Sequence, residues 1–98
     1  MARQPQPSTT QRILQQRGER YGKFADHADC SQQLKAVLRN HMGADKWNSL
    51  TASQQEALEM LCHKLGRIAN GDPNYEDTWR DLAGYSTLVA DELIGIQR

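Results

Sequence analysis

Four carboxylates in the second half of the chain have the spacing to surround one metal ion. Glu56 and Glu59 are three residues apart. Asp77 and Asp81 are four residues apart. At 100° per residue each pair shares one face of a helix, and two antiparallel helices would bring the pairs together. Such oxygen ligands suit Mg²⁺ bound to a polyphosphate. The alternative is a solvated acidic face whose carboxylates serve the helix dipole and surface ion pairs.

Basic side chains in two segments of the chain are candidates for binding phosphate. Lys64 and Arg67 are three residues apart on the predicted third helix, and Arg17 and Arg20 flank Gly18 beside the aromatic Tyr21. Guanidinium forks and ammonium groups both recognise phosphate, and an aromatic ring can stack on a nucleobase. The alternative for Lys64 and Arg67 is solvent exposure or ion pairing, with Asp81 as a partner across the helix hairpin.

The elements that position these residues are predicted to be helices. No segment alternates apolar and polar residues with the period of two that a half-buried strand requires. We therefore expect an all-α protein, a small bundle of about four helices. Its centre is an antiparallel helix hairpin of residues 52–70 and 75–95. Residues 1–8, which contain two prolines, are predicted to be a flexible leader, and residues 9–98 a single helical domain.

Local capping signals set the predicted helix boundaries. A Ser or Thr followed three residues later by Gln forms a capping box, which satisfies two free backbone N–H groups. A glycine just past an apolar helical pattern marks the end of a helix. We predict capping boxes at Ser8–Gln11 and Thr51–Gln54, helix ends before Gly18 and at Gly43, and a cap at Asn74.

The fourth predicted helix has two faces that are not purely polar. Its main apolar face comprises Tyr75, Trp79, Leu82, Val89, Ala90 and Leu93. On the other side lie Gly84 and Leu88, with Tyr85 on the flank, where it could also stack on a nucleobase. A leucine and a helix-weakening glycine are unusual on a solvent-facing side. We therefore predict that a second copy of the chain packs on Gly84, Tyr85 and Leu88, so that a homodimer completes the bundle.

Composition excludes several classes of protein. The 98 residues contain twelve Lys and Arg and twelve Asp and Glu, so the net charge is zero and indiscriminate nucleic-acid binding is not expected. The charge is uneven, however, because residues 1–24 carry +4 and residues 72–98 carry −4. No apolar run is long enough to span a membrane. Two cysteines make no disulfide framework, and we expect a cytoplasmic protein.

Three sequence elements resemble those of a family of small helical phage and prophage proteins. They are Arg-Tyr-Gly at residues 20–22, K-x-x-R-I at residues 64–68 and D-x-x-x-D-L-A-G-Y at residues 77–85. The resemblance extends over residues 13–93. It implies an accessory protein in the cytoplasm of a bacterial host.

That family in turn is distantly similar to the MazG-type all-α nucleotide pyrophosphohydrolases. Those enzymes hold Mg²⁺ with an E-x-x-E pair on one helix and an E-x-x-D pair on a later one, usually in dimers. Glu56-Ala-Leu-Glu59 matches the first pair. Asp77 and Asp81 depart from the second because they are four residues apart. The resemblance implies Mg²⁺ as cofactor, held by these four residues.

Two functions follow as hypotheses. The first is MazG-like binding of a nucleoside or deoxynucleoside triphosphate, with or without its hydrolysis to monophosphate and pyrophosphate. In that case the four carboxylates would bind metal and activate water, and Lys64, Arg67 and Arg20 would hold the phosphates. The second is a non-catalytic binding protein that sequesters a nucleotide signal or inhibits a host defence protein.

Overall fold

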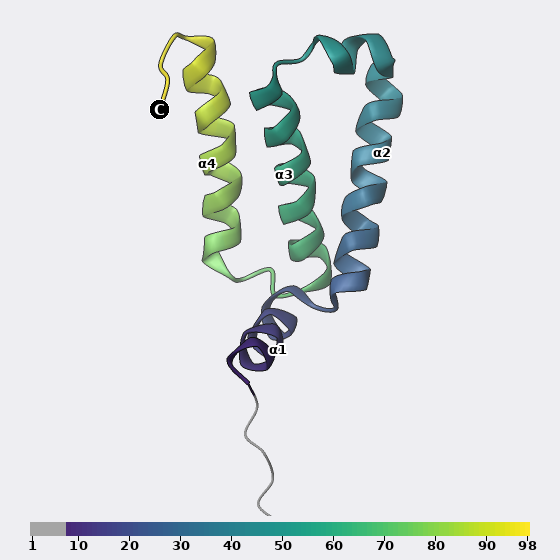
Figure 1. Cartoon of the computed structure of the whole chain (residues 1–98), viewed down its shortest axis with the longest axis vertical. Helices are drawn as coiled ribbons and strands as arrows, with labels where there is room; N and C mark the ends of the chain where they lie inside the picture. The colour runs from purple at the N-terminus through teal and green to yellow at the C-terminus, as the bar shows by residue number, and fades with distance from the viewer. Residues whose placement is uncertain (1–7) are drawn as a thin grey trace, which may run out of the picture.

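The computed structural model describes residues 8–98, which form four α-helices and, over that range, no strand. They are α1 (Thr9–Tyr21), α2 (Phe24–Ser49), α3 (Ala52–Asn70) and α4 (Glu76–Leu93). Figure 1 shows α2, α3 and α4 side by side with alternating directions, and α1 at the end of the layer where α2 begins. The all-α class with four helices is confirmed. The predicted leader lies, apart from Ser8, outside the described residues.

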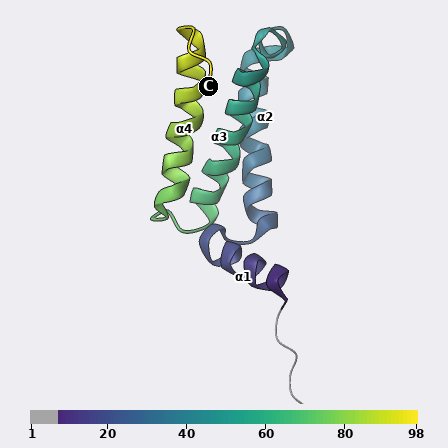
Figure 2. The same ribbon diagram turned by 60° about the vertical axis from the view of Figure 1, so that its left-hand side comes forward.

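The central helix of the layer is α3, which packs on α2 on one side and on α4 on the other. The fourth helix contacts only α3 among the described helices, whereas α1 contacts both α2 and α3. Figure 2 shows α1 lying across the end of the layer rather than alongside it. The predicted hairpin corresponds to α3 and α4. None of the described helices is both long enough and apolar enough to cross a membrane.

The predicted capping boxes are present at both helix starts. The Ser8 hydroxyl accepts the Gln11 backbone N–H at 3.1 Å, and the Gln11 side chain accepts the Ser8 N–H at 2.7 Å. Thr51 and Gln54 make the same pair of bonds at 3.1 and 2.9 Å. Gly43 interrupts α2 with a φ of 77°, a conformation that favours glycine. A further helical segment then continues to Ser49.

Two predicted boundaries were wrong. The first helix does not end before Gly18 but continues to Tyr21 and ends at Gly22, whose φ is 78°. A glycine within a helix costs only about 1 kcal/mol, which tertiary contacts can offset. Asn74 is not the cap of α4, since its backbone N–H donates to the Asp72 carboxylate at 2.9 Å and Tyr75 takes the cap position without a side-chain bond.

The packed face of α4 also differs from the prediction. Thr78 is buried, whereas Trp79 is 51% exposed and Leu93 is 70% exposed. The Trp79 indole N–H donates to the Pro73 carbonyl at 2.8 Å, which holds the ring at the start of the helix instead of against α3. Tyr85, predicted on the second face, borders a groove between α3 and α4.

One chain buries very little apolar surface. Among the described residues, Ala57 and Cys62 are the only buried hydrophobic ones, and no large side chain is fully buried. The predicted interface residues Gly84 and Leu88 are uncovered: a Cβ on Gly84 would meet nothing within 4 Å, and Leu88 is 45% exposed. A layer of three helices leaves one broad side open and the other covered only in part by α1, which explains this low burial.

Candidate functional site

The four predicted metal ligands do not converge in the structure. Glu59 pairs with Arg39 of α2 at 2.6 Å, and Asp77 accepts the Tyr75 hydroxyl at 2.9 Å. Glu56 is exposed and borders the groove between α3 and α4. No group of three or more His, Cys, Asp or Glu side chains within residues 8–98 is arranged to hold a metal ion. The expected carboxylate cluster is therefore absent from the described part of one chain, and magnesium binding stays a prediction.

The fourth carboxylate, Asp81, pairs with Lys64 at 3.0 Å across α3 and α4. This is the ion pair that the sequence offered as the alternative to phosphate binding. The Lys64 side chain is only 11% exposed, whereas the Asp81 side chain is 47% exposed. The lysine therefore lies between the two helices as part of their packing. The two acidic pairs do not meet because Glu59 pairs with α2 and Glu56 lies beside a later part of α4, near Tyr85.

Arg20 also has a partner within the chain. Its guanidinium group lies 4.7 Å from the centre of the Tyr75 ring and donates to the Tyr75 hydroxyl at 3.2 Å. That hydroxyl donates in turn to Asp77, and this hydrogen bond is the main reason why the pKa of Tyr75 is raised. Arg20 thus ties α1 to the start of α4, which is a structural role.

The end of α1 meets the end of α3 through two glycines. A Cβ at Gly22 would collide with the Asn70 carbonyl, and one at Gly71 would collide with the Arg20 backbone. The Asp72 N–H donates to the Arg20 carbonyl at 2.6 Å. These close approaches leave room for no other residue type, and they place Tyr21 beside the last turns of α3.

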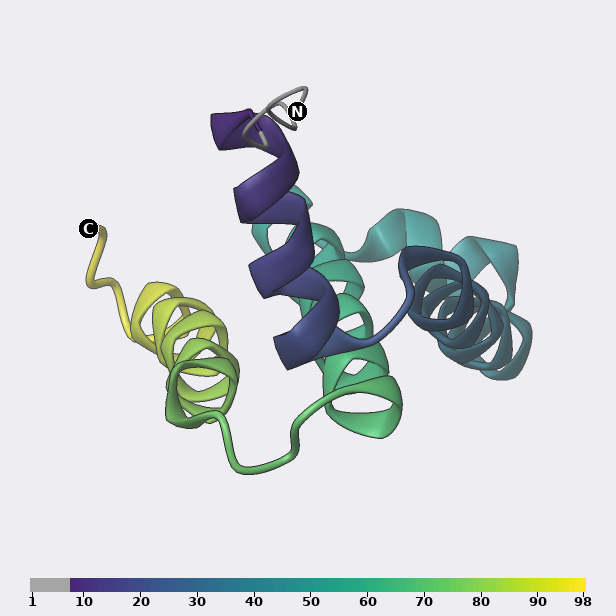
Figure 3. The ribbon, with the colours of Figure 1, turned by 90° about the horizontal axis from the view of Figure 1, so that it is seen from below.

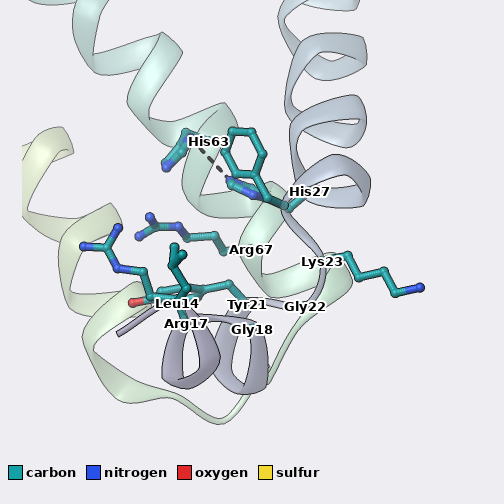
Figure 4. A pocket seen from close by; sticks show the side chains of 10 residues that line it. Leu14, Arg17, Gly18, Tyr21, Gly22, Lys23, His27, His63 and Arg67 are labelled. Atoms are coloured by element: carbon teal, nitrogen blue, oxygen red, sulfur yellow. Dashed lines mark hydrogen bonds between the residues drawn. The ribbon is translucent and has the colours of Figure 1, made fainter. Parts of the chain in front are cut away.

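The cavity that results lies between α1, the start of α2 and α3, and has a volume of about 450 Å³ (Figure 4). Arg67 lies over the Tyr21 ring, with its guanidinium carbon 4.0 Å from the ring centre. Its Nε atom is buried and has no hydrogen-bond partner among residues 8–98. The lining residues are Leu14, Arg17, Gly18, Tyr21, Gly22, Lys23, Phe24, His27, His63 and Arg67.

The charges around this cavity, which we call the α1 pocket, are all positive. Figure 4 shows the guanidinium groups of Arg17 and Arg67 on the same side of the pocket, while Lys23 extends away in the opposite direction. None of the described lining residues is acidic. Two converging guanidinium groups without a carboxylate create a local positive potential, which favours an anionic ligand.

Two histidines form the inner wall of the α1 pocket. His27 is 4% exposed, and its Nε2 lies 3.4 Å from the Nδ1 of His63. One ring donates and the other accepts in this hydrogen bond, so at least one ring is neutral. Burial first, and the Arg67 guanidinium second, lower the pKa of His63 from 6.5 to about 4. The same two causes lower the pKa of His27. The pocket thus holds the neutral imidazoles of His27 and His63 together with the positively charged Arg17 and Arg67.

Of the residues predicted to bind phosphate or a base, the structure brings together only Arg67 and Tyr21. Lys64 and Arg20 have structural partners, and Tyr85 lies between α3 and α4. Arg17, which the sequence places beside Arg20 and Tyr21, also lines the pocket, whereas Phe24 and the histidine pair were not predicted. The available sequence signal was that His63 and Arg67 are four residues apart and so share one face of α3.

A protein family model described as a domain of unknown function (DUF6378) matches residues 8–93. The chain belongs to this family. The match covers all four helices, so the whole layer and the α1 pocket are part of the DUF6378 domain. No curated protein and no solved structure matched the chain.

Proposed function

We propose that this DUF6378 domain binds a phosphate-bearing small molecule of the nucleotide class in the α1 pocket. The observation that carries the proposal is Arg67, which has a buried Nε atom without a partner in the described chain and lies over an aromatic ring. Arg17 adds a second guanidinium group on the same side (Figure 4). Forked donors of this kind fit phosphate oxygens.

The size and lining of the pocket support a nucleotide rather than a simple ion. A volume of about 450 Å³ is within the range of cavities that hold small organic ligands. Phe24 is 76% exposed at the pocket, which makes its ring available for stacking on a base. Nothing in the carboxylate geometry supports turnover, so binding is the function that we favour over pyrophosphohydrolysis.

Binding is tested by calorimetric titration with ATP, GTP and pyrophosphate, each with and without Mg²⁺. We expect one site per chain, and Arg67→Gln should weaken binding about 10- to 150-fold, the worth of one hydrogen bond to a charged group. Arg17→Gln is the second variant, because Arg17 is exposed and its loss spares the packing against Tyr21. If none of the three compounds binds the wild-type protein, the proposal is wrong.

The matched control is Arg80→Gln, which makes the same change in net charge. Arg80 is exposed on α4 and pairs with Glu76, away from the pocket. A nonspecific charge effect would weaken binding in both variants equally, and that result would contradict the proposal. Release of pyrophosphate from the nucleotide in the presence of Mg²⁺ would instead favour the MazG-like enzyme.

We also propose that the working unit is a homodimer. The support is the small core of one chain, in which no large side chain is fully buried. Domains of this size need more buried apolar surface than that to be stable alone.

A nucleotide ligand is also compatible with the bacterial cytoplasm and the phage or prophage origin predicted from the sequence.

A further inference from the structure

The layer of α2, α3 and α4 has two broad sides, and the described helices cover only one of them in part. Figure 3, seen from below, shows α1 projecting from one side of the layer. His63 and Arg67 of the α1 pocket lie on that same side (Figure 4). No described helix lies on the other side, which is therefore available to a partner.

The contacts of α3 identify the side chains on that uncovered side. Gly66 faces α2, Lys64 faces α4 and Arg67 faces α1. Successive residues are 100° apart, so these three contacts occupy three of the four directions around the helix. Leu65 points in the fourth direction, as does Leu58 two turns earlier. Leu65 is 42% exposed, as expected for a side chain without a covering element.

The flanking helices contribute further apolar side chains to the same side. Thr78 is buried, and the next residue, Trp79, is 100° further around α4 and is 51% exposed. Helical spacing places Leu93 of α4 and Val37 of α2 on the same side. We define the open face by Val37, Leu65, Trp79 and Leu93, which are between 42% and 70% exposed. An uncharged group of this kind resembles the interior of a domain rather than its surface.

We infer that the open face binds the open face of a second copy of the chain. This inference rests on the proposed homodimer and names its surface. The 19 residues of α3 span roughly 28 Å. Three helices about 9 Å apart make the face roughly 27 Å wide, so it offers on the order of 750 Å². That area is close to the roughly 800 Å² that each partner buries in a stable interface.

The small core of one chain selects a second copy over another protein. A partner that supplies the missing burial must be present whenever the chain folds, and another copy always is. Interfaces of such permanent dimers are more apolar than those of transient complexes, as if a domain core were cut in half. The four apolar residues of the open face have this character, with Asp26 and Asp29 beside Val37 at its α2 edge, and a symmetric pair would become two stacked layers.

Substitution of two leucines of similar exposure tests whether the dimer forms through the open face or through the α4 surface that was predicted from the sequence. Leu65 lies on the open face, and Leu88, 45% exposed, lies on the α4 surface with Gly84 and Tyr85. We expect wild type to be a dimer by light scattering and analytical ultracentrifugation. Leu65→Glu should raise the dimer dissociation constant at least 100-fold, and Leu88→Glu should leave it within about threefold.

Different outcomes of these measurements would contradict the proposed surface and the proposed dimer. If Leu88→Glu dissociates the dimer and Leu65→Glu does not, the dimer stands but the open face is the wrong surface. If wild type is a folded monomer at tens of micromolar, the homodimer and the surface both fail. A protein captured on the open face of that monomer would be its occupant instead.

The Leu65→Glu variant could unfold once its dimer dissociates, so a second measurement uses a conservative variant. Trp47→Phe leaves Trp79 as the single tryptophan. In a dimer formed through the open face, acrylamide should quench Trp79 weakly at high protein concentration and more strongly on dilution. Quenching that is strong at every concentration, for a sample shown to be dimeric, would overturn the inference.

Discussion

The histidine pair makes the stability of the protein depend on pH, and the sign follows from the structure. Burial and Arg67 lower the pKa of His63 from 6.5 to about 4. Between those two values the unfolded chain binds a proton that the folded chain excludes. Stability is therefore complete above pH 6.5 and decreases as the pH falls toward 4.

The size of the effect follows from the same two pKa values. By linkage, His63 alone should reduce the free energy of unfolding by about 2 kcal/mol between pH 7 and pH 5. Its ring is partly exposed, so about 1 kcal/mol is a reasonable lower bound. His27, whose pKa is also lowered, adds to the loss in the same direction. Acidification thus removes an appreciable fraction of the stability of a small domain.

Urea unfolding at pH 7 and pH 5 measures this loss, and His63→Gln should remove most of the His63 contribution. His41→Gln is the matched control, because His41 is exposed near the other end of α2. An NMR titration gives the direct result. If the His63 ring titrates near pH 6.5, or if His63→Gln leaves the pH dependence unchanged, the reasoning from burial and Arg67 is refuted.

Three further predictions concern the pocket and the helix ends. A bound phosphate group should raise the pKa of the pocket imidazoles. Calorimetry should therefore show tighter binding at pH 5.5 than at pH 7.5, together with uptake of protons. Release of protons on binding would contradict this. In thermal unfolding, Gly22→Ala should destabilise the protein by about 1–3 kcal/mol, because its Cβ would collide with Asn70 and its φ is positive. Gly18→Ala is the matched variant, since its Cβ meets nothing within 4 Å, and it should stabilise the protein by up to about 1 kcal/mol. Lys64→Met should leave nucleotide affinity unchanged and change stability by no more than about 1 kcal/mol, since the paired Asp81 is well solvated; a large loss of affinity would return Lys64 to the phosphate site.

Helix positions could be predicted from the sequence because their signals are local. The capping box of Thr51 and Gln54 involves four consecutive residues, and the positive φ of Gly43 concerns one residue. Neither depends on what packs nearby. The end of α1 could not be predicted from local signals. Gly18 is compatible with a continuing helix, and the packing of Tyr21 and Gly22 against the end of α3 determines where the helix stops.

Site geometry was harder to predict because it depends on how each helix is rotated. Glu56 and Glu59 share a face on an isolated helix, yet Glu59 turns to Arg39 of α2 and Glu56 borders the α4 groove. The distance between them along the helix cannot show which neighbour each one meets. His27 and His63 are 36 residues apart, and only the packing of α2 on α3 brings them together.

The α1 pocket and the open face lie on opposite sides of the same layer. Covering one side with a second copy would leave Arg17 and Arg67 uncovered on the other, so a symmetric dimer would carry two separate pockets. Both α2 and α3 contribute to both surfaces, with His27 and Arg67 on the pocket side and Val37 and Leu65 on the open face. Ligand binding and dimerisation would then be linked only through the stability of α2 and α3. Because a ligand that binds both forms equally shifts no equilibrium, saturating nucleotide should leave the dimer dissociation constant unchanged while raising the melting temperature.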